Sequence, residues 1–365
     1  MKYQTEFRDS GKVKAIAAQI RQLATKPWRI MEVCGGQTHS ILKYGLDELA
    51  PAGIEFLHGP GCPICVTPTE VIDLALELSL RENVLFCSFG DMLRVPGSKE
   101  DLLSLKAKGA DIRMVYSPLD AVKLARDNPA KEVVFFAVGF ETTAPANALS
   151  VLQARQLGLS NYSILVSQVL VPPAIEGLLQ NPATRIDAFL AAGHVCTIMG
   201  ETEYKSIVEK YRIPIAITGF EPVDILEGLK SCVEMLETGK VALENQYKRS
   251  VRAEGNPAAR QALTEVFEIK SQRWRGLGEL PHSGLGINEK YREYDAARKF
   301  CLATKPREEA VNCISGEILM GLKKPTDCPE FCHNCHPQNP LGATMVSEEG
   351  ACHAYYLYKQ RGEPH

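Results

Sequence analysis

Short apolar runs alternate with amphipathic segments over the first two thirds of the chain. Runs of strand length lie at 29–33, 54–58, 84–89, 112–116 and 133–138, and further runs follow at 163–169, 186–190 and 213–218. Between the runs, apolar residues recur every three or four positions, as in the segment from Val13 to Leu23, which is the spacing of an amphipathic helix. Regular alternation of strands and helices predicts right-handed βαβ units and mostly parallel sheets.

This alternation continues for longer than one small sheet can accommodate. We therefore expect two doubly wound parallel-sheet α/β domains, over residues 1–120 and 121–240, joined within Ser117–Asp127. Beyond Lys240 the pattern weakens, with one helix expected over 256–267 and a glycine-rich, irregular segment over 274–286. Six cysteines and little periodic apolar sequence follow between Cys301 and Cys352, so residues 241–365 are predicted to form a third domain that a metal organises.

Composition narrows the class of protein. The 365 residues are 45% hydrophobic and 23% charged, which is ordinary for a globular protein, and the net charge of -3 comes without a basic stripe. These values disfavour nucleic acid as a partner. No apolar run approaches the ~20 residues that cross a bilayer, and the polar N-terminus lacks a signal-peptide core. We therefore expect a cytoplasmic protein without a membrane partner, whose twelve cysteines serve metal binding or redox chemistry.

The first two predicted strands each lead into a cysteine. The first delivers Cys34 into a Gly-Gly turn, followed by a helix over 38–49, and the second leads into the Gly-Pro-Gly loop that holds Cys62 and Cys65. Because the carboxyl ends of parallel strands meet at one edge of a sheet, the three thiols and His39 are expected to converge there.

The Cys62-Pro-Ile-Cys65 spacing fits either a dithiol that cycles with a disulfide or a pair of metal ligands. Two inert core thiols are disfavoured because the pair lies among glycines and prolines. A single histidine is more often structural than a ligand, but His39 shares a glycine-rich loop with Cys34, which makes it a candidate. His58 and His194 also follow strands and are weaker candidates.

The most apolar strand ends in Gly139-Phe140-Glu141-Thr142-Thr143, and a similar Gly219-Phe220-Glu221 closes a later strand. A glutamate at such a position can cap the following helix and complement its dipole. The functional alternative is a carboxylate aimed into a cleft between domains, which we favour for Glu141 with its two threonines.

The C-terminal cysteines offer a second metal site. Four thiolates serve both structural zinc and iron–sulfur clusters. Only Cys332 and Cys335 have the short spacing of a zinc knuckle, and the long arms on either side favour a cluster wrapped by loops. With five cysteines at 313, 328, 332, 335 and 352, spacing alone leaves the ligand set open.

Cys87 and Cys232 lie in apolar surroundings and are expected in the core. The chain has no Walker-type or Gly-x-Gly-x-x-Gly nucleotide motif.

The motifs together resemble the hydrogenase maturation family HypD over nearly the whole chain. They are Cys34-Gly-Gly-x-Thr-His39, Gly59-Pro-Gly-Cys-Pro-x-Cys65, Gly139-Phe-Glu-Thr-Thr143 and the series Cys313, Cys328, Cys335 and Cys352. The resemblance implies that these last four cysteines hold a [4Fe–4S] cluster and that Cys332 lies outside the ligand set. Gln37 stands where the family commonly has histidine, so no role for a histidine carries over to that position.

The resemblance also implies a function. HypD-like proteins pair with a HypC-like chaperone and hold the iron on which the Fe(CN)2CO group of [NiFe] hydrogenases is built, with cyanide supplied by a HypE-like donor and HypF upstream. By this resemblance Cys34 is the first iron ligand, Cys62 and Cys65 are further ligands or a redox dithiol, and His39 orients or protonates the Cys34 site. Glu141, Thr142 and Thr143 line the cleft. Such a protein is an assembly scaffold with redox chemistry rather than a conventional turnover enzyme.

Two other functions fit parts of the pattern. A free-standing iron–sulfur thiol–disulfide oxidoreductase would use Cys62, Cys65 and the cluster, but has no need of Cys34. A zinc-stabilised binding module would have no redox chemistry at all.

Overall fold

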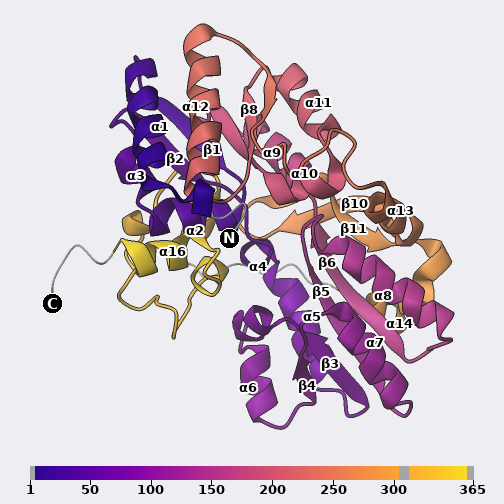
Figure 1. The fold of residues 1–365 in the computed structure, drawn as a ribbon. Coiled ribbons are helices and arrows are strands. Elements are labelled where there is room, and N and C mark those ends of the chain that lie inside the picture. Colours follow the sequence, from indigo (N-terminus) through magenta and orange to yellow (C-terminus); the bar gives the residue numbers. More distant parts are fainter. Residues whose placement is uncertain (1–4, 304–311, 360–365) are drawn as a thin grey trace.

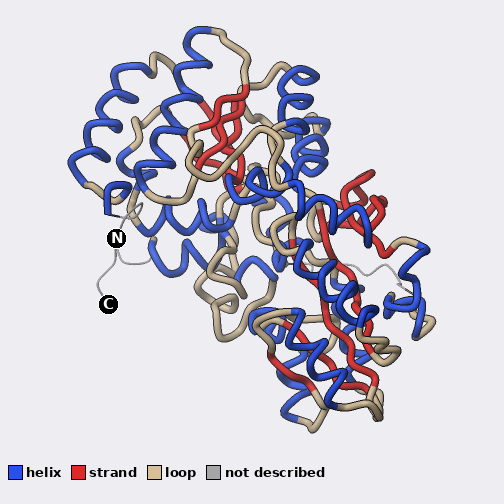
Figure 2. Tube along the Cα trace, turned by 45° about the vertical axis from the view of Figure 1, so that its right-hand side comes forward, coloured by secondary structure: helices blue, strands red, loops and turns tan. Residues whose placement is uncertain are grey.

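The computed structural model describes residues 5–303 and 312–359, and its strands form two separate sheets. Figure 1 shows one sheet in the upper part of the molecule and the other in the lower part, with the C-terminal segment packed beside α2. In Figure 2 each group of strands has helices around it, whereas loops dominate the region between them. The expected α/β class, with two sheets and an irregular cysteine-rich C-terminal region, is confirmed.

The first sheet is entirely parallel, in the order β2-β1-β7-β8-β9. Its strands are β1 (Trp28–Glu32), β2 (Ile54–His58), β7 (Ala188–Ala192), β8 (Ile215–Thr218) and β9 (Leu243–Asn245). One apolar cluster joins it to α1 (Ser10–Leu23), α2 (Gly35–Lys43), α3 (Leu46–Leu49) and α12 (Pro222–Thr238). A second cluster joins it to α9 (Val171–Gln180), α10 (Gly193–Met199) and α11 (Thr202–Tyr211). The strand order reverses between β1 and β7, which makes this the switch point of a doubly wound sheet.

The second sheet is mostly parallel, in the order β10-β11-β6-β5-β3-β4. Its parallel strands are β3 (Val84–Ser88), β4 (Ile112–Met114), β5 (Glu132–Gly139) and β6 (Tyr162–Val169). Its faces are covered by α5 (Thr69–Ser79), α6 (Leu102–Ala107) and α14 (Ala296–Lys299) on one side, and by α7 (Pro118–Asp127), α8 (Ala144–Gln156) and α13 (Pro257–Val266) on the other. The reversal of strand order lies between β3 and β5, so the loop that carries Glu141 follows a switch-point strand.

The membership of the sheets crosses the expected boundary at residue 120. Strand β1 pairs with β2 on one side and with β7 on the other, whereas β3 joins β5 in the other sheet. The chain therefore leaves the first sheet after β2 and returns to it at β7. The hydrophobic pattern does not reveal which sheet a strand joins, because a buried parallel strand has the same apolar sequence in either sheet.

Two local expectations were wrong. The segment over 274–286, expected to be irregular, forms most of an antiparallel hairpin of β10 (Phe267–Trp274) and β11 (Gly278–Ile287). Its glycines serve the turn, where Gly276 has a φ of 79°, and close packing, because a Cβ at Gly284 would collide with Gln272. The helix expected over 38–49 begins at Gly35 and breaks at Gly45, whose φ is 62°.

The C-terminal region is built of short pieces. They are α15 (Ser315–Leu319), the 3-10 turns Pro325–Asp327 and Ala343–Met345, and α16 (Ala351–Tyr358). Helix α16 packs against α2, and the turn Ala343–Met345 packs against the short helix α4 (Pro63–Val66). The C-terminal cysteines are thereby brought toward both N-terminal cysteine loops. Within the described ranges, no helix is long and apolar enough to span a bilayer.

Candidate functional site

Cys34 lies directly after β1, at the start of α2 and at the switch point of the first sheet. The side chain is 2% exposed. The backbone N–H of Gly35 donates to the carbonyl of Gly61 at 2.8 Å, and a Cβ at Gly61 would collide with the Cys34 backbone. The loop that precedes Cys62 thus packs directly on the Cys34 loop, as expected for neighbouring parallel strands.

The imidazole beside Cys34 belongs to His194 of α10. Its Nε2 lies 3.7 Å from the Cys34 Sγ, and its ring stacks on Phe220 with centroids 4.9 Å apart. Burial lowers the pKa of His194 to about 4, so the ring is neutral near pH 7. Burial raises the pKa of the Cys34 thiol, and the carboxylates of Glu349 and Glu32 raise it further.

His39 points elsewhere. Its Nε2 lies 3.3 Å from the hydroxyl of Tyr358 in α16, and the two rings meet edge to face. The expected glycine turn is in fact the first turn of α2, and residues five apart on a helix face directions about 140° apart. Cys34 and His39 therefore diverge, although they are close in sequence. His194 follows β7 at the switch point, and only the strand order could have singled it out from the other histidines that follow strands.

Cys62 and Cys65 form a disulfide at the start of α4. Their exposed fractions are 3% and 2%. Pro63 occupies the first helical position, and the N–H of Cys65 donates to the Cys62 sulfur at 3.2 Å. The two cysteines are thus held as a buried redox-capable pair, one loop away from Cys34.

Glu141 is fully buried after β5. One carboxylate oxygen accepts the N–H of Val171, the first residue of α9, at 2.9 Å, whereas the other has no hydrogen-bond partner in the described part of the chain. Burial raises the pKa of Glu141 to about 8. Thr142 is half-buried, and the Thr143 hydroxyl donates to the carbonyl of Phe140 at 3.2 Å. The loop therefore contributes a protonated carboxyl group in the core at neutral pH.

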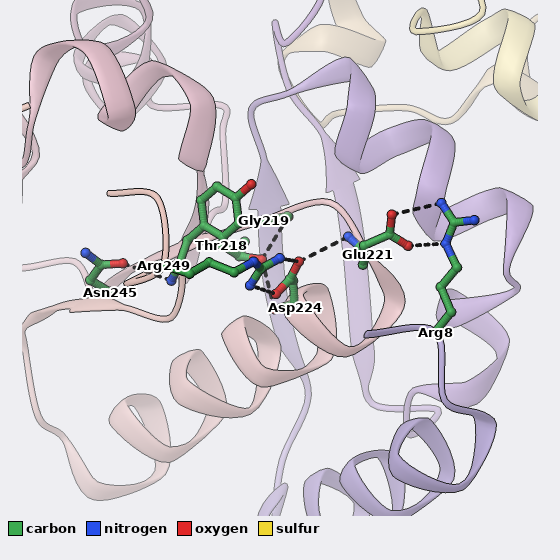
Figure 3. Close-up of polar contacts among 8 residues, drawn as sticks. Arg8, Thr218, Gly219, Glu221, Asp224, Asn245 and Arg249 are labelled. Atoms are coloured by element: carbon green, nitrogen blue, oxygen red, sulfur yellow. Dashed lines mark hydrogen bonds and ion pairs between the residues drawn. The ribbon is translucent and has the colours of Figure 1, made fainter. Parts of the chain in front are cut away.

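The second such loop is organised differently (Figure 3). Glu221 pairs with Arg8, and Asp224 receives two hydrogen bonds from Arg249, at 2.7 and 2.6 Å. Phe220, beside His194, also lines a cavity of about 310 Å³ together with Tyr247 and Arg249. Aromatic surface thus continues outward from the Cys34 site.

The four C-terminal cysteines that match the motif series lie close enough to affect one another electrostatically. Burial raises the pKa of Cys352, and Cys313, Cys335 and Cys328 raise it further. A Cβ at Gly342 would collide with the Cys313 sulfur, so this position has room only for glycine. Backbone N–H groups of the same loop donate toward Cys335. Cys332 has a φ of 63° and its N–H donates to the Cys335 carbonyl.

The four cysteines have the donor chemistry that a [4Fe–4S] cluster requires. A [4Fe–4S] cluster takes one thiolate on each of its four irons, so its ligands surround the cluster instead of meeting at a point. Four mutually interacting thiols, with a glycine against one and N–H donors against another, suit that geometry.

Two residues near Cys34, Glu32 and Glu349, were not selected from the sequence for this site, whereas His58 was a weaker candidate. Glu32 and Glu349 place carboxylates near the thiol, and His58 contacts Glu32. A glutamate inside an apolar strand, as Glu32 is, was the available signal, because a buried charge needs a partner. Glu349 carried no comparable signal, since only the packing of its backbone on Gly35 brings it to the site.

Comparison with known proteins identifies the family. The family model described as "HypD: Hydrogenase formation hypA family" matches residues 11–359. Hydrogenase maturation factor HypD of Rhodobacter capsulatus is 48% identical over 370 residues, covering 98% of each chain. The Azotobacter vinelandii factor of the same name is 46% identical (98% of this chain, 97% of that protein), and the Escherichia coli K12 factor is 42% identical over 99% of each. With these motifs placed around two neighbouring cysteine loops, the chain belongs to the HypD family of hydrogenase maturation factors.

Proposed function

We propose that this chain is the scaffold on which, together with a HypC-like chaperone, the Fe(CN)2CO group of a [NiFe] hydrogenase is assembled. The observation that carries the proposal is the position of Cys34, a buried thiol at the switch point with a neutral imidazole at 3.7 Å and a redox-capable cysteine pair on the adjoining loop. Low-spin iron with cyanide and carbonyl ligands is a soft centre that suits thiolate. Iron here is cargo rather than a resident cofactor.

Cys34 is proposed as the iron ligand that this chain provides, with a partner cysteine as a second. His194 presents a ring nitrogen to the same position, whereas the geometry gives His39 a packing contact with α16. Backbone N–H groups at the start of α2 suit the anionic cyanides. The cavity beside Phe220 offers an aromatic surface on which a HypC-like partner can dock.

Cys62 and Cys65 are proposed as the two-electron reductant for cyanide release. A HypE-like donor carries cyanide as a protein thiocyanate, and two electrons convert that group into a thiolate and a free cyanide ion. The same two electrons are released when the Cys62–Cys65 dithiol closes to a disulfide with loss of two protons, so the exchange is balanced. A Cys62–Cys65 disulfide is the form that such a step would leave, and the pair has the geometry to form it.

The C-terminal cysteines Cys313, Cys328, Cys335 and Cys352 are proposed to hold the [4Fe–4S] cluster. When bound, the cluster supplies single electrons at low potential. The chain's own contribution is to keep this region packed on α4, which carries the Cys62–Cys65 pair.

Glu141, Thr142 and Thr143 are proposed to support the site from the second sheet. Glu141 holds a proton in a buried position at neutral pH and accepts a hydrogen bond from the first residue of α9. Helix α9 packs in the same apolar core cluster as Cys34. Its role is to donate a hydrogen bond or proton within this core.

The test is anaerobic co-purification of the chain with its HypC-like partner, followed by metal analysis and infrared spectroscopy. Cys34→Ala is expected to abolish the cyanide and carbonyl bands and the extra iron, because the ligand is lost. Cys232→Ala is the matched control, since Cys232 is fully buried in the first-sheet core away from the cysteine loops. Unchanged bands in Cys34→Ala would sink the scaffold and favour the thiol–disulfide oxidoreductase, and stoichiometric zinc in a colourless protein would favour the zinc-stabilised module.

A further inference from the structure

Glu32 and His58 form a buried ionisable pair between the two N-terminal cysteine loops. The exposed fraction of Glu32 is 0% and that of His58 is 4%, and His58 Nδ1 lies 2.8 Å from a carboxylate oxygen of Glu32. The two residues are register partners at the ends of β1 and β2. Each therefore stands at the last position of a strand, immediately before its loop.

On one side the pair holds the Cys34 loop. The backbone N–H of Cys34 donates to the second carboxylate oxygen of Glu32 at 2.9 Å, and the hydroxyl of Thr38, one turn into α2, donates to the first. A carboxylate taken out of water needs several such donors to be stable. The first turn of α2 is thus fastened at both Cys34 and Thr38 to one buried group.

On the other side the pair holds the loop that leads to Cys62. His58 is followed directly by Gly59, whose N–H donates to the Glu32 carbonyl at 2.8 Å. The His58 ring also packs edge to face on Tyr355 of α16, with centroids 5.4 Å apart, and Cys352 lies one turn earlier on that helix. The imidazole thus contacts Glu32 and the C-terminal helix, and His58 directly precedes the disulfide loop in the chain.

We propose that Glu32 and His58 are positioning residues that hold the Cys34 loop in place against the Cys62–Cys65 loop. This inference rests on the proposed function, because it concerns the separation of the proposed iron ligand from the proposed reductant. The pair sets that separation through hydrogen bonds to backbone and to a helix side chain, so that the Cys34 loop cannot lift from its neighbour. Loss of the Glu32–His58 pair leaves Cys34, Cys62 and Cys65 in the chain but frees the loop that carries Cys34.

The test measures how fast N-ethylmaleimide modifies individual cysteines in the anaerobically purified chain, with no partner and no added iron. Mass spectrometry follows the peptides of Cys34 and Cys232 in the same sample. Cys232 is fully buried in a core of the same sheet, so it reports general loosening, whereas Cys34 reports its own loop. Glu32 itself is left unchanged because its charge acts directly on the Cys34 thiol.

His58→Ala removes the donor to Glu32 and is expected to raise the ratio of Cys34 to Cys232 modification about tenfold, the size typical of coupled neighbouring residues. His58→Asn keeps an N–H near the position of Nδ1 and should stay within about twofold of the wild type. Ser150→Ala removes a buried hydrogen bond to Tyr162 in the other sheet and is the control, with no change in the ratio expected.

Thr38→Val removes only a hydroxyl and covers the case in which His58→Ala does not fold; it should raise the ratio about threefold. A ratio of Cys34 to Cys232 modification that stays at the wild-type value in His58→Ala and Thr38→Val would overturn the proposal. A parallel rise in Cys232 modification would do the same. Because no iron or partner is used, that failure leaves the scaffold function standing, whereas retained iron in Cys34→Ala removes the scaffold function without affecting this result.

Discussion

Two loops with the same three residues behave differently in this protein. Gly139-Phe140-Glu141 and Gly219-Phe220-Glu221 each follow a parallel strand and precede a helix. In the first, the phenylalanine is 3% exposed and stacks on Trp274, and the glutamate is buried with no ion pair to any residue that the structure describes. In the second, the phenylalanine is half-buried against His194, and the glutamate pairs with Arg8 at the surface.

The difference comes from what each loop packs against. The first loop faces α9 and the core shared with the first sheet, so its glutamate loses water and keeps its proton. The second faces the N-terminal segment, so its glutamate pairs with Arg8 and caps α12. An identical tripeptide therefore supplies a core group in one place and a wall of the Cys34 site in the other.

The largest effect is expected from the two phenylalanines. Phe140→Ala should lower the free energy of unfolding by about 3–5 kcal/mol, because a large ring leaves a packed core. Phe220→Ala should lower it by only about 1–2 kcal/mol, because part of the ring is already in water. Urea unfolding of both variants measures the contrast, and equal losses would show that the loops are packed alike.

A second effect is expected in the way the free energy of unfolding depends on pH. The folded pKa of Glu141, about 8, lies above its value in the unfolded chain, so between about 4.5 and 8 the folded state binds a proton that the unfolded state has lost. Glu141 therefore makes stability fall as pH rises through this window. Glu141→Gln has no such proton, and its stability relative to wild type should increase from pH 5 to pH 8.

Unfolding midpoints of both proteins across this range test the sign. Glu221→Gln is the matched control, since its carboxylate is only partly buried and pairs with Arg8. A wild-type profile parallel to that of Glu141→Gln would mean that Glu141 ionises normally and that the loops do not differ in this respect.

The smallest effect is expected from the ion pair of the second loop. Arg8 is exposed, and surface pairs contribute little once side-chain entropy and screening are included. Arg8→Ala should leave the unfolding midpoint within error of wild type in high salt and shift it slightly in low salt. A shift comparable to that of Phe140→Ala would show that the N-terminal segment is part of the core.

Much of the fold and part of the site followed from local pattern. Buried strands of continuous apolar sequence and helices of regular spacing were predictable from residue order, and so were the cysteines that follow β1 and β2, because consecutive parallel strands usually lie side by side. The hairpin of β10 and β11 was missed because β10 is largely polar and β11 is rich in glycine, and such strands resemble loops in sequence. The sequence placed His39 beside Cys34, whereas the structure places the His194 ring there and His39 beside Tyr358, because proximity in sequence is not proximity in space.

The sequence by itself determined the α/β class and the family, and it singled out the thiols that we propose for metal binding and electron exchange. It also determined that Cys34 and the Cys62–Cys65 pair would adjoin. Only the tertiary structure decided which histidine meets Cys34, which glutamates lose water, and which face of α2 carries His39 to α16. These depend on strand order, in which β7 returns beside β1 after β3 to β6 have entered the second sheet, and long-range pairing of this kind leaves no periodic trace in the chain.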